Sequence, residues 1–188
     1  MRKLLLLTAF LATPVMAQDA DGPGPNLVIE IAGEANGRVV IDMFEDLAPG
    51  HVEQITGLAE EGAYDNVVFH RVINGFMAQT GDVQYGKVGG DIAFAGRGSS
   101  ERPNLQAEFS DVNYDRGIVG MARSQSPNSA NSQFFIMFEE GPFLNGQYTV
   151  VGRVIEGMDV VDAIKRGDGP NGAVIGEPDR MVSVTVER

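Results

Sequence analysis

The sequence predicts a mainly β fold, in which an antiparallel sheet closes on itself and two helices complete the domain. Three observations support this prediction. Short runs rich in Val and Ile recur along the chain and are separated by turn signals, including the Asn-Gly pairs Asn36-Gly37 and Asn74-Gly75. Two longer stretches have the apolar spacing of helices, and the sequence contains no internal repeat. With 188 residues, the chain is long enough for one domain with a sizeable core.

The N-terminus has the three regions of an export signal. Met1–Lys3 is basic, Leu4–Ala12 is apolar, and Val15–Ala17 offers the small residues of a cleavage site. We therefore predict a signal peptide over residues 1–17 and an exported protein, periplasmic or, as a second choice, secreted. The alternative is an uncleaved membrane anchor, for which the apolar segment is short.

Residues 18–25 are rich in Gly and Pro and are expected to form a linker. The domain is then expected to cover residues 26–188. This part of the sequence lacks an apolar run of about 18 residues, so we predict no membrane association after cleavage of the signal.

The charge balance argues against nucleic acid as a partner. Cleavage after Ala17 removes two of the 14 basic residues and none of the 26 acidic ones, which leaves a net charge of −14. Such a chain repels phosphates and anionic membranes. The chain also has no cysteine and only two histidines, so we predict neither a metal site nor a cofactor.

The domain begins with a predicted hairpin. Leu27–Ala32 and Arg38–Phe44 are rich in Val and Ile and flank the Asn-Gly turn signal. A helix follows, because Pro49 suits a first helical turn and Gly62 a C-cap. Its apolar face contains Val52, Ile55, Leu58 and Ala59. We predict that His51, in the first turn, is a surface residue.

A second predicted hairpin pairs Val67–Ile73 with Phe76–Gln79 across Asn74-Gly75. Alternation predicts a shared face for Val67, Phe69, Arg71 and Ile73. After the turn, Met77 and Gln79 share a face by the same rule. Gln79 could accept a hydrogen bond from Arg71 and leave other guanidinium donors free. The alternative is an ordinary surface hairpin with a solvated arginine.

The remaining elements follow from the same patterns. Residues 81–104 are rich in Gly and Ser and predict a long loop, of the kind that is usually functional or mobile. Val182, Val184 and Val186 alternate with Met181, Ser183 and Thr185 in the last predicted strand. The other strands are predicted over Gly117–Met121, Gln133–Met137 and Tyr148–Val154, and a second helix over Gly157–Arg166.

Two nucleotide-binding patterns occur but are incomplete. Residues 81–88 match a phosphate-binding loop except at the last position, where Val88 replaces the hydroxyl residue that would hold Mg²⁺. Residues 167–172 read G-x-G-x-x-G, but they follow a predicted helix instead of a strand, and Pro170 interrupts the expected helix start. We interpret both segments as loops.

Two blocks of sequence resemble a known family. Residues 69–82 read Phe-His-Arg-Val-Ile-Asn-Gly-Phe-Met-Ala-Gln-Thr-Gly-Asp, which closely resembles the cyclophilin signature F-H-R-[VI]-I-x-G-F-M-x-Q-x-G-D. Gln133–Ile136, followed by Gly141–Leu144, resembles the second active-site block of the same family. The resemblance runs from about Leu27 to Arg188. It implies a closed eight-stranded barrel capped by two helices, and peptidyl-prolyl cis-trans isomerase (rotamase) activity.

The resemblance also implies roles for individual residues. Arg71 matches the catalytic arginine and Gln79 the residue that holds it. The implied proline pocket consists of Phe76, Met77, Phe135 and Leu144, whereas we interpret Phe134 as core. The other implied substrate-binding positions are His70, Ala122, Arg123, Gln133, Phe143 and Tyr148. Ala122 and Arg123 match a backbone segment that would bond the substrate as an added strand.

Two positions depart from the pattern of many eukaryotic cyclophilins. Phe143 stands where those proteins have Trp, and Tyr148 where they have His. The lost indole N–H predicts weak cyclosporin binding at most. Residues 124–131 are also one residue longer than the eukaryotic form.

The predicted function is X-Pro bond isomerisation in unfolded or partly folded exported polypeptides, by a monomer that assists protein folding. Rotation makes and breaks no bond, so the reaction needs neither nucleophile nor metal. One alternative is a proline-peptide binding module or holdase in which catalysis is incidental. Another is an exported hydrolase, although no G-x-S-x-G motif is present.

Overall fold

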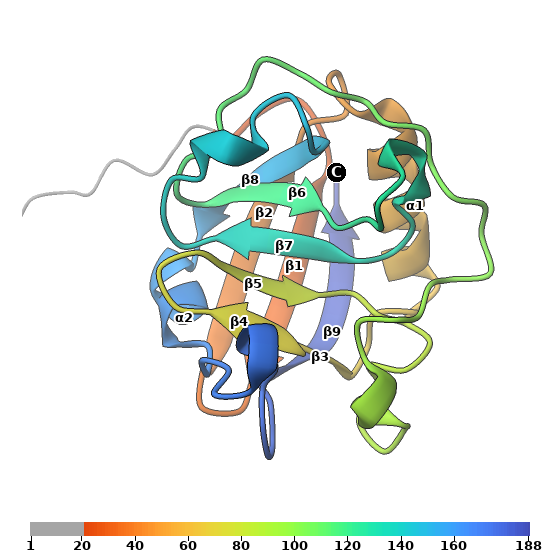
Figure 1. The fold of residues 1–188 in the computed structure, drawn as a ribbon. Helices are drawn as coiled ribbons and strands as arrows, with labels where there is room; N and C mark the ends of the chain where they lie inside the picture. The colour runs from red at the N-terminus through yellow and green to blue at the C-terminus, as the bar shows by residue number, and fades with distance from the viewer. Residues whose placement is uncertain (1–20) are drawn as a thin grey trace, which may run out of the picture.

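The computed structural model describes residues 21–188, so the predicted signal peptide and the first residues of the linker lie outside the described part. One antiparallel sheet curls around the core in the order β3-β9-β1-β2-β8-β6-β7-β5-β4 (Figure 1). Its strands are β1 (Asn26–Ala32), β2 (Gly37–Met43), β3 (Val67–Val68), β4 (Arg71–Ile73), β5 (Met77–Thr80), β6 (Ile118–Met121), β7 (Phe134–Met137), β8 (Val150–Glu156) and β9 (Arg180–Glu187).

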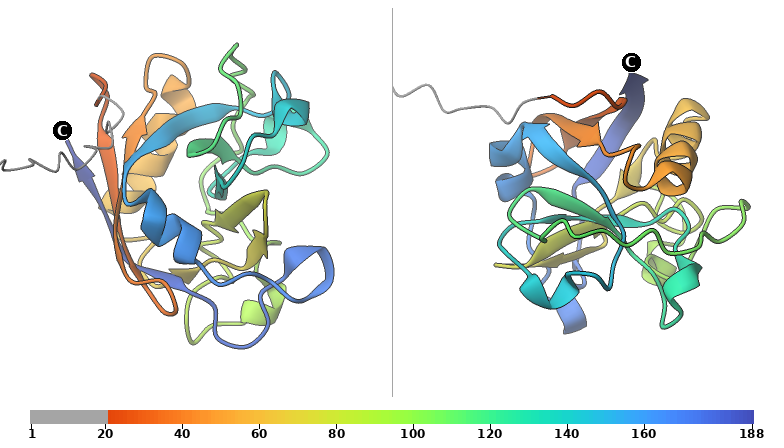
Figure 2. Two further views of the ribbon diagram at one scale, coloured as in Figure 1. Left: turned by 90° about the vertical axis from the view of Figure 1, so that its left-hand side faces the viewer. Right: turned by 90° about the horizontal axis from the view of Figure 1, so that it is seen from above.

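The sheet is open and has nine strands, so the prediction of a closed eight-stranded barrel is wrong in both respects. The expected strand over residues 67–73 divides at Phe69-His70. Its first part, β3, pairs with β9, and its second part, β4, pairs with β5. Backbone groups at the division bond instead to the segment before β9, because the Phe69 N–H donates to the Asp179 carbonyl and the His70 carbonyl accepts from Val174. The result is a strongly curled half-barrel (Figure 2).

The division also changes which side chains share a face. Val67 and Phe69 are buried in the core inside the sheet, and so is Val72. Arg71 and Ile73 are only half-buried and lie on the other face. The predicted single face for residues 67, 69, 71 and 73 is therefore wrong beyond Phe69, because the strand is interrupted there.

Two helices cover the sheet. The first, α1 (Pro49–Glu60), packs against β9, and α2 (Met158–Ala163) packs against β2, on opposite sides of the molecule in Figure 1. Gly62 has a φ of +68° and its N–H donates to the Ala59 carbonyl, which confirms its predicted place just beyond the helix end. Four short 3₁₀ turns complete the fold: Ile92–Phe94, Pro127–Ser129, Pro142–Leu144 and Pro170–Gly172.

His51 is fully buried, so its prediction as a surface residue is wrong. The Glu108 side chain reaches the start of α1 and accepts hydrogen bonds from the N–H groups of Gly50 and His51, each at 3.1 Å. It also lies 2.6 Å from Nδ1 of the His51 ring. Burial alone would raise the pKa of Glu108, but these bonds outweigh it and hold the pKa below its ordinary value.

Strand β9 contains a bulge opposite Glu30 and Ile31 of β1. The extra residue shifts the alternation, so that Met181 and Val184 are buried while Val182 is exposed. The predicted alternation of Val182, Val184 and Val186 is therefore wrong at Val182.

Buried apolar residues form two clusters. The larger, here called the main core, lies between the sheet and α1 and includes Val52, Phe69 and Phe134. The smaller, here called the pocket cluster, consists of Met77, Tyr114, Ile118, Phe135, Met137, Leu144 and Val150. Within residues 21–188, no helix is both long enough and apolar enough to cross a membrane.

Candidate active site

An apolar pocket of about 390 Å³ opens at the edge of the pocket cluster. Residues of the β4–β5 hairpin, of β7 and of the 3₁₀ turn Pro142–Leu144 line this pocket. The pocket brings together ten residues that the sequence predicted for the site: Arg71, Phe76, Met77, Gln79, Ala122, Arg123, Phe135, Phe143, Leu144 and Tyr148.

Three hydrogen bonds to two residues hold the Arg71 guanidinium in place. Its Nη1 donates to Oε1 of Gln79 at 3.1 Å, as expected from their direct pairing across β4 and β5. Its Nε donates to the Asn171 carbonyl at 3.0 Å, and its Nη2 to Oδ1 of Asn171 at 3.1 Å. A guanidinium carries five N–H donors, so two remain without a partner among residues 21–188, one on Nη1 and one on Nη2.

Gln79 belongs to a chain of hydrogen bonds that fixes its orientation. Its amide Nε2 donates to Oε1 of Gln133 at 3.0 Å, and Nε2 of Gln133 donates to the Gly98 carbonyl at 2.8 Å. With both amide nitrogens committed as donors, Oε1 of Gln79 is directed at Arg71. The chain thereby ties the position of Arg71 to the loop that contains Gly98.

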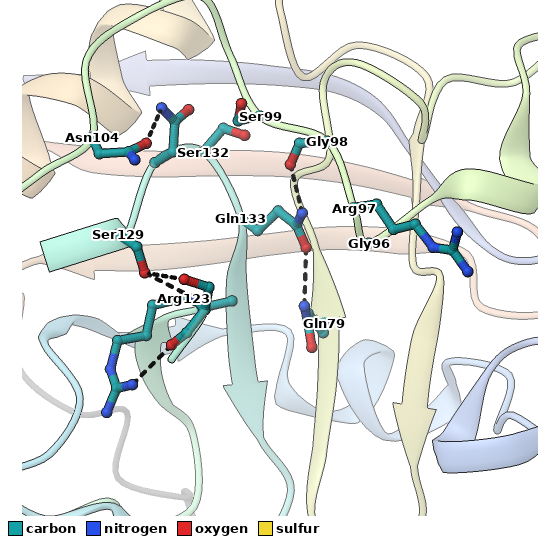
Figure 3. Close-up of a pocket in the computed structure, with 13 residues that line it drawn as sticks. Gln79, Gly96, Arg97, Gly98, Ser99, Asn104, Arg123, Ser129, Ser132 and Gln133 are labelled. Atoms are coloured by element: carbon teal, nitrogen blue, oxygen red, sulfur yellow. Dashed lines mark hydrogen bonds between the residues drawn. The ribbon is translucent and has the colours of Figure 1, made fainter. Parts of the chain in front are cut away.

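A second, polar hollow of about 300 Å³ adjoins the apolar pocket and shares Gln79, Ala122 and Arg123 with it. Gln133 lies there between Gln79 and Gly98, with Ser129 and Arg123 on one side and Arg97 on the other (Figure 3). The predicted substrate contact Gln133 thus lines the hollow and not the apolar pocket.

The two cavities are electrostatically unlike the rest of the chain. Their lining residues include Arg71, Arg97 and Arg123 but no carboxylate, although the full chain has a net charge of −12. Burial lowers the pKa of Arg71, an effect that Tyr148 partly opposes. Residues 21–188 contain no cluster of three or more His, Cys, Asp or Glu side chains placed to hold a metal ion.

Comparison with known proteins shows the family of this chain. Residues 27–186 match the family model described as cyclophilin type peptidyl-prolyl cis-trans isomerase/CLD. The chain belongs to the cyclophilin-type peptidyl-prolyl cis-trans isomerase family. It is accordingly an isomerase of the peptidyl-prolyl cis-trans type.

Relatives with this description cover most of the chain. A probable peptidyl-prolyl cis-trans isomerase of Brucella suis is 52% identical, over 99% of this chain and 96% of its own length. Peptidyl-prolyl cis-trans isomerase B of Escherichia coli is 38% identical, over 69% of this chain and 79% of its own length.

Solved structures of cyclophilins share the fold. The cyclophilin AquaCyp293 of Hirschia baltica superposes with a TM-score of 0.70 at 27% identity, covering 88% of this chain and 74% of that one. A Cryptosporidium parvum cyclophilin solved in the presence of the dipeptide Ala-Pro superposes with a TM-score of 0.73 at 25% identity, covering 87% of this chain and 99% of that one.

His70 is the one predicted site residue that lines neither cavity of this isomerase. Its ring lies beneath Gly96, where an added Cβ would come within 3.1 Å of the ring atoms. Both ring nitrogens are buried without a hydrogen-bond partner among the described residues. Burial, assisted by Arg71 and opposed by Asp82, lowers the pKa of His70 to about 4. The ring is therefore neutral at pH 7.

The rim of the apolar pocket is aromatic. Phe143 is 62% exposed and its ring centre lies 5.4 Å from that of Phe76. Tyr148 packs edge-on against Phe135, and the Arg123 guanidinium lies over its ring at 4.2 Å. The Ala122 N–H already donates to the Gln133 carbonyl, so that group is not free to bond a peptide.

Two residues of the site were not predicted. Gln147 lines the apolar pocket, where its carbonyl accepts from Nη2 of Arg123 at 2.9 Å. Asn171 bonds Arg71 from within the G-x-G-x-x-G segment, which the sequence predicts to be a loop. The only sequence signal for Asn171 was the Gly-rich segment itself. The role of that segment depends on the strand against which it packs, and the sequence does not show which strand that is.

Proposed function

We propose that Arg71 accelerates rotation about X-Pro bonds by donating to the twisted amide while the proline ring occupies the apolar pocket. The main support is the braced Arg71 guanidinium, which lines the pocket together with Phe76, Met77 and Phe135 and has two N–H groups without a partner among residues 21–188.

Rotation about an X-Pro bond faces a barrier of about 18–20 kcal/mol, because the amide C–N bond is partly double. In the twisted state the nitrogen loses conjugation and becomes a better acceptor. A donor directed at that nitrogen therefore stabilises the twisted state more than the planar one, which is what lowers a barrier. Bringing an event of tens of seconds to milliseconds needs roughly four decades, or about 5–6 kcal/mol.

Arg71→Ala tests this mechanism directly. We expect isomerisation of an Ala-Pro peptide to fall at least about a hundredfold, the usual effect of removing one preorganised donor. Peptide affinity should remain largely intact, because the apolar side chains of the pocket are unchanged. A protease-coupled assay measures the first quantity and a calorimetric titration the second.

Arg38→Ala is the matched control, since it removes an arginine whose partners are Glu156 and Glu187 on the outside of the sheet. If Arg71→Ala isomerises as fast as the parent, the mechanism is wrong. Binding without any catalysis in the parent would favour instead a proline-peptide binding module or holdase.

We further propose that the substrates are unfolded or partly folded exported polypeptides, and that the isomerase assists their folding in the periplasm or, as a second choice, outside the cell. The basic, apolar and small-residue regions of residues 1–17 support export. Mass spectrometry of the protein from fractionated cells should find Gln18 as the first residue, outside the cytoplasm. An intact Met1 terminus in the membrane fraction would support the anchor instead.

The proposal has two further parts. We expect a monomer, which light scattering would test. We also expect weak cyclosporin binding at most, because Phe143 has no ring N–H to donate at the pocket rim; tight binding in a calorimetric titration would contradict this.

A further inference from the structure

The segment before β9, residues 164–179, lies along the outer edge of β4. The Gly167 N–H donates to the Val72 carbonyl at 2.9 Å, and the Val174 N–H donates to the His70 carbonyl at 3.1 Å. Between these two attachments, the short 3₁₀ turn Pro170–Gly172 places Asn171 beside Arg71. The segment is therefore tied to the strand that carries the proposed catalytic side chain.

The backbone at Asn171 has an uncommon conformation. Its φ is +57°, and only Asn66, at +61°, shares a positive φ among the described residues other than glycine. Asparagine tolerates this region better than most residues. The following residue must be small, since a Cβ on Gly172 would lie 2.4 Å from Cγ1 of Ile73. The turn therefore packs closely against β4, and this packing keeps Asn171 within hydrogen-bond distance of Arg71.

Asn171 contributes two acceptors to one guanidinium. Its carbonyl takes the proton of Nε and its Oδ1 a proton of Nη2, whereas Gln79 takes a proton of Nη1. Without Oδ1, Nη2 would have no partner among residues 21–188. The guanidinium would then be held only at Nε and Nη1, and it could turn more freely about its long axis.

We infer that Asn171 is a positioning residue of this isomerase, which holds the Arg71 guanidinium so that its two remaining N–H groups keep one direction at the rim of the apolar pocket. The inference rests on the proposed function, in which Arg71 is the donor. Gln79 and Asn171 then act as a two-sided brace, one from within the sheet and the other from the segment before β9.

Asn171→Gly is the sharpest variant, because glycine keeps the positive φ and the carbonyl acceptor while removing the side chain, and with it the Oδ1 acceptor. We expect the interconversion rate of enzyme-bound peptide, measured by NMR exchange, to fall about tenfold, as for the loss of one hydrogen bond to a charged group. Peptide affinity should stay within about twofold of the parent. Rotation about the Nε–Cζ bond of Arg71, followed by NMR of the guanidinium, should become several-fold faster.

Two further variants separate positioning from general effects of the substitution. Asn66→Gly makes the same change at the other left-handed asparagine, whose backbone bonds Met181 and Val88, and should behave as the parent in all three measurements. Asn171→Asp retains an oxygen acceptor and should recover most of the rate that Asn171→Gly loses.

A parent-like rate in Asn171→Gly would overturn the inference, as would a slower rate with unchanged rotation of the Arg71 guanidinium. Arg71→Ala shows which proposal has failed. If that variant is as fast as the parent, the proposed function is wrong, whatever Asn171 does. If Arg71→Ala is slow and Asn171→Gly is not, only the role of Asn171 is wrong.

Discussion

The main core and the pocket cluster both consist of apolar residues, many of them on strands of the same sheet. They differ in that only the pocket cluster borders the apolar pocket. The main core is covered by α1, and none of its buried members lines the apolar pocket. The pocket cluster ends at a cavity, where Met77, Phe135 and Leu144 are at once buried residues and lining of the pocket. In an antiparallel sheet, which face a side chain takes therefore decides whether it serves stability alone or also binding.

Strand β7 offers the sharpest test of this comparison, because Phe134 and Phe135 are neighbours on opposite faces. Phe134 is 1% exposed and packs edge-on against Tyr64 in the main core. Phe134→Ala should lower the free energy of unfolding by about 3–5 kcal/mol, since it leaves a closed cavity. Phe135→Ala should cost less stability, because its gap opens into the pocket, but it should weaken binding of a proline peptide.

Urea denaturation and peptide titration of both variants measure these differences. Equal losses of stability together with equal peptide affinities would mean that the two clusters are not functionally distinct.

His70 lies where the strand divides into β3 and β4. The pH dependence of stability that its ring contributes tests whether the ring is shielded from water. Its pKa in the folded protein is about 4, below the ordinary 6.5, so between these values the unfolded chain binds more protons. Stability should therefore fall as the pH drops from about 6.5 to about 4, by roughly 3 kcal/mol from this group at most.

Denaturant titrations at pH 7 and pH 4.5 would show this, with His70→Gln as the comparison. The variant should lack this part of the pH dependence and keep that of the carboxylates. Identical pH profiles for parent and variant would indicate that the ring is solvated.

The smallest expected effect compares two buried tyrosines, one in each cluster. In the main core, the Tyr64 hydroxyl donates to the Ser132 carbonyl at 2.8 Å. In the pocket cluster, the Tyr114 hydroxyl is buried without a partner among residues 21–188. Tyr64→Phe should therefore cost about 1 kcal/mol, whereas Tyr114→Phe should be neutral or slightly stabilising. Thermal denaturation measures both, and a larger loss for Tyr114→Phe would reveal an ordered water at that hydroxyl.

Features set by neighbouring residues could be predicted from the sequence. The hairpin at Asn36-Gly37 and helix α1 are present close to their expected bounds, whereas the hairpin at Asn74-Gly75 is present with a shorter first strand, β4. Gln79 was expected to accept a hydrogen bond from Arg71; the structure confirms this bond and shows the two residues paired across β4 and β5. The residues that line the pocket, by contrast, were predicted mainly from the family resemblance, because they are far apart in the sequence.

Features set by distant residues could not be predicted. His51 is buried and contacts Glu108, which comes 57 residues later and reaches the start of α1. The division at Phe69-His70 depends on bonds to Asp179 and Val174, and the bulge at Val182 on pairing with β1. Asn171 was missed because its Gly-rich segment was compared only with nucleotide-binding loops, whereas its packing partner is β4.

The open sheet has a consequence for self-association. An unpaired edge can recruit a strand from another molecule and start an aggregate. Here the two edges, β3 and β4, are only two and three residues long. Other segments of the same chain already bond to both edges: Gly86 and Lys87 to β3, and Gly167 and Ala173 to β4. The chain thus leaves little backbone for a second copy to pair with, a property suited to a protein that would work among unfolded polypeptides.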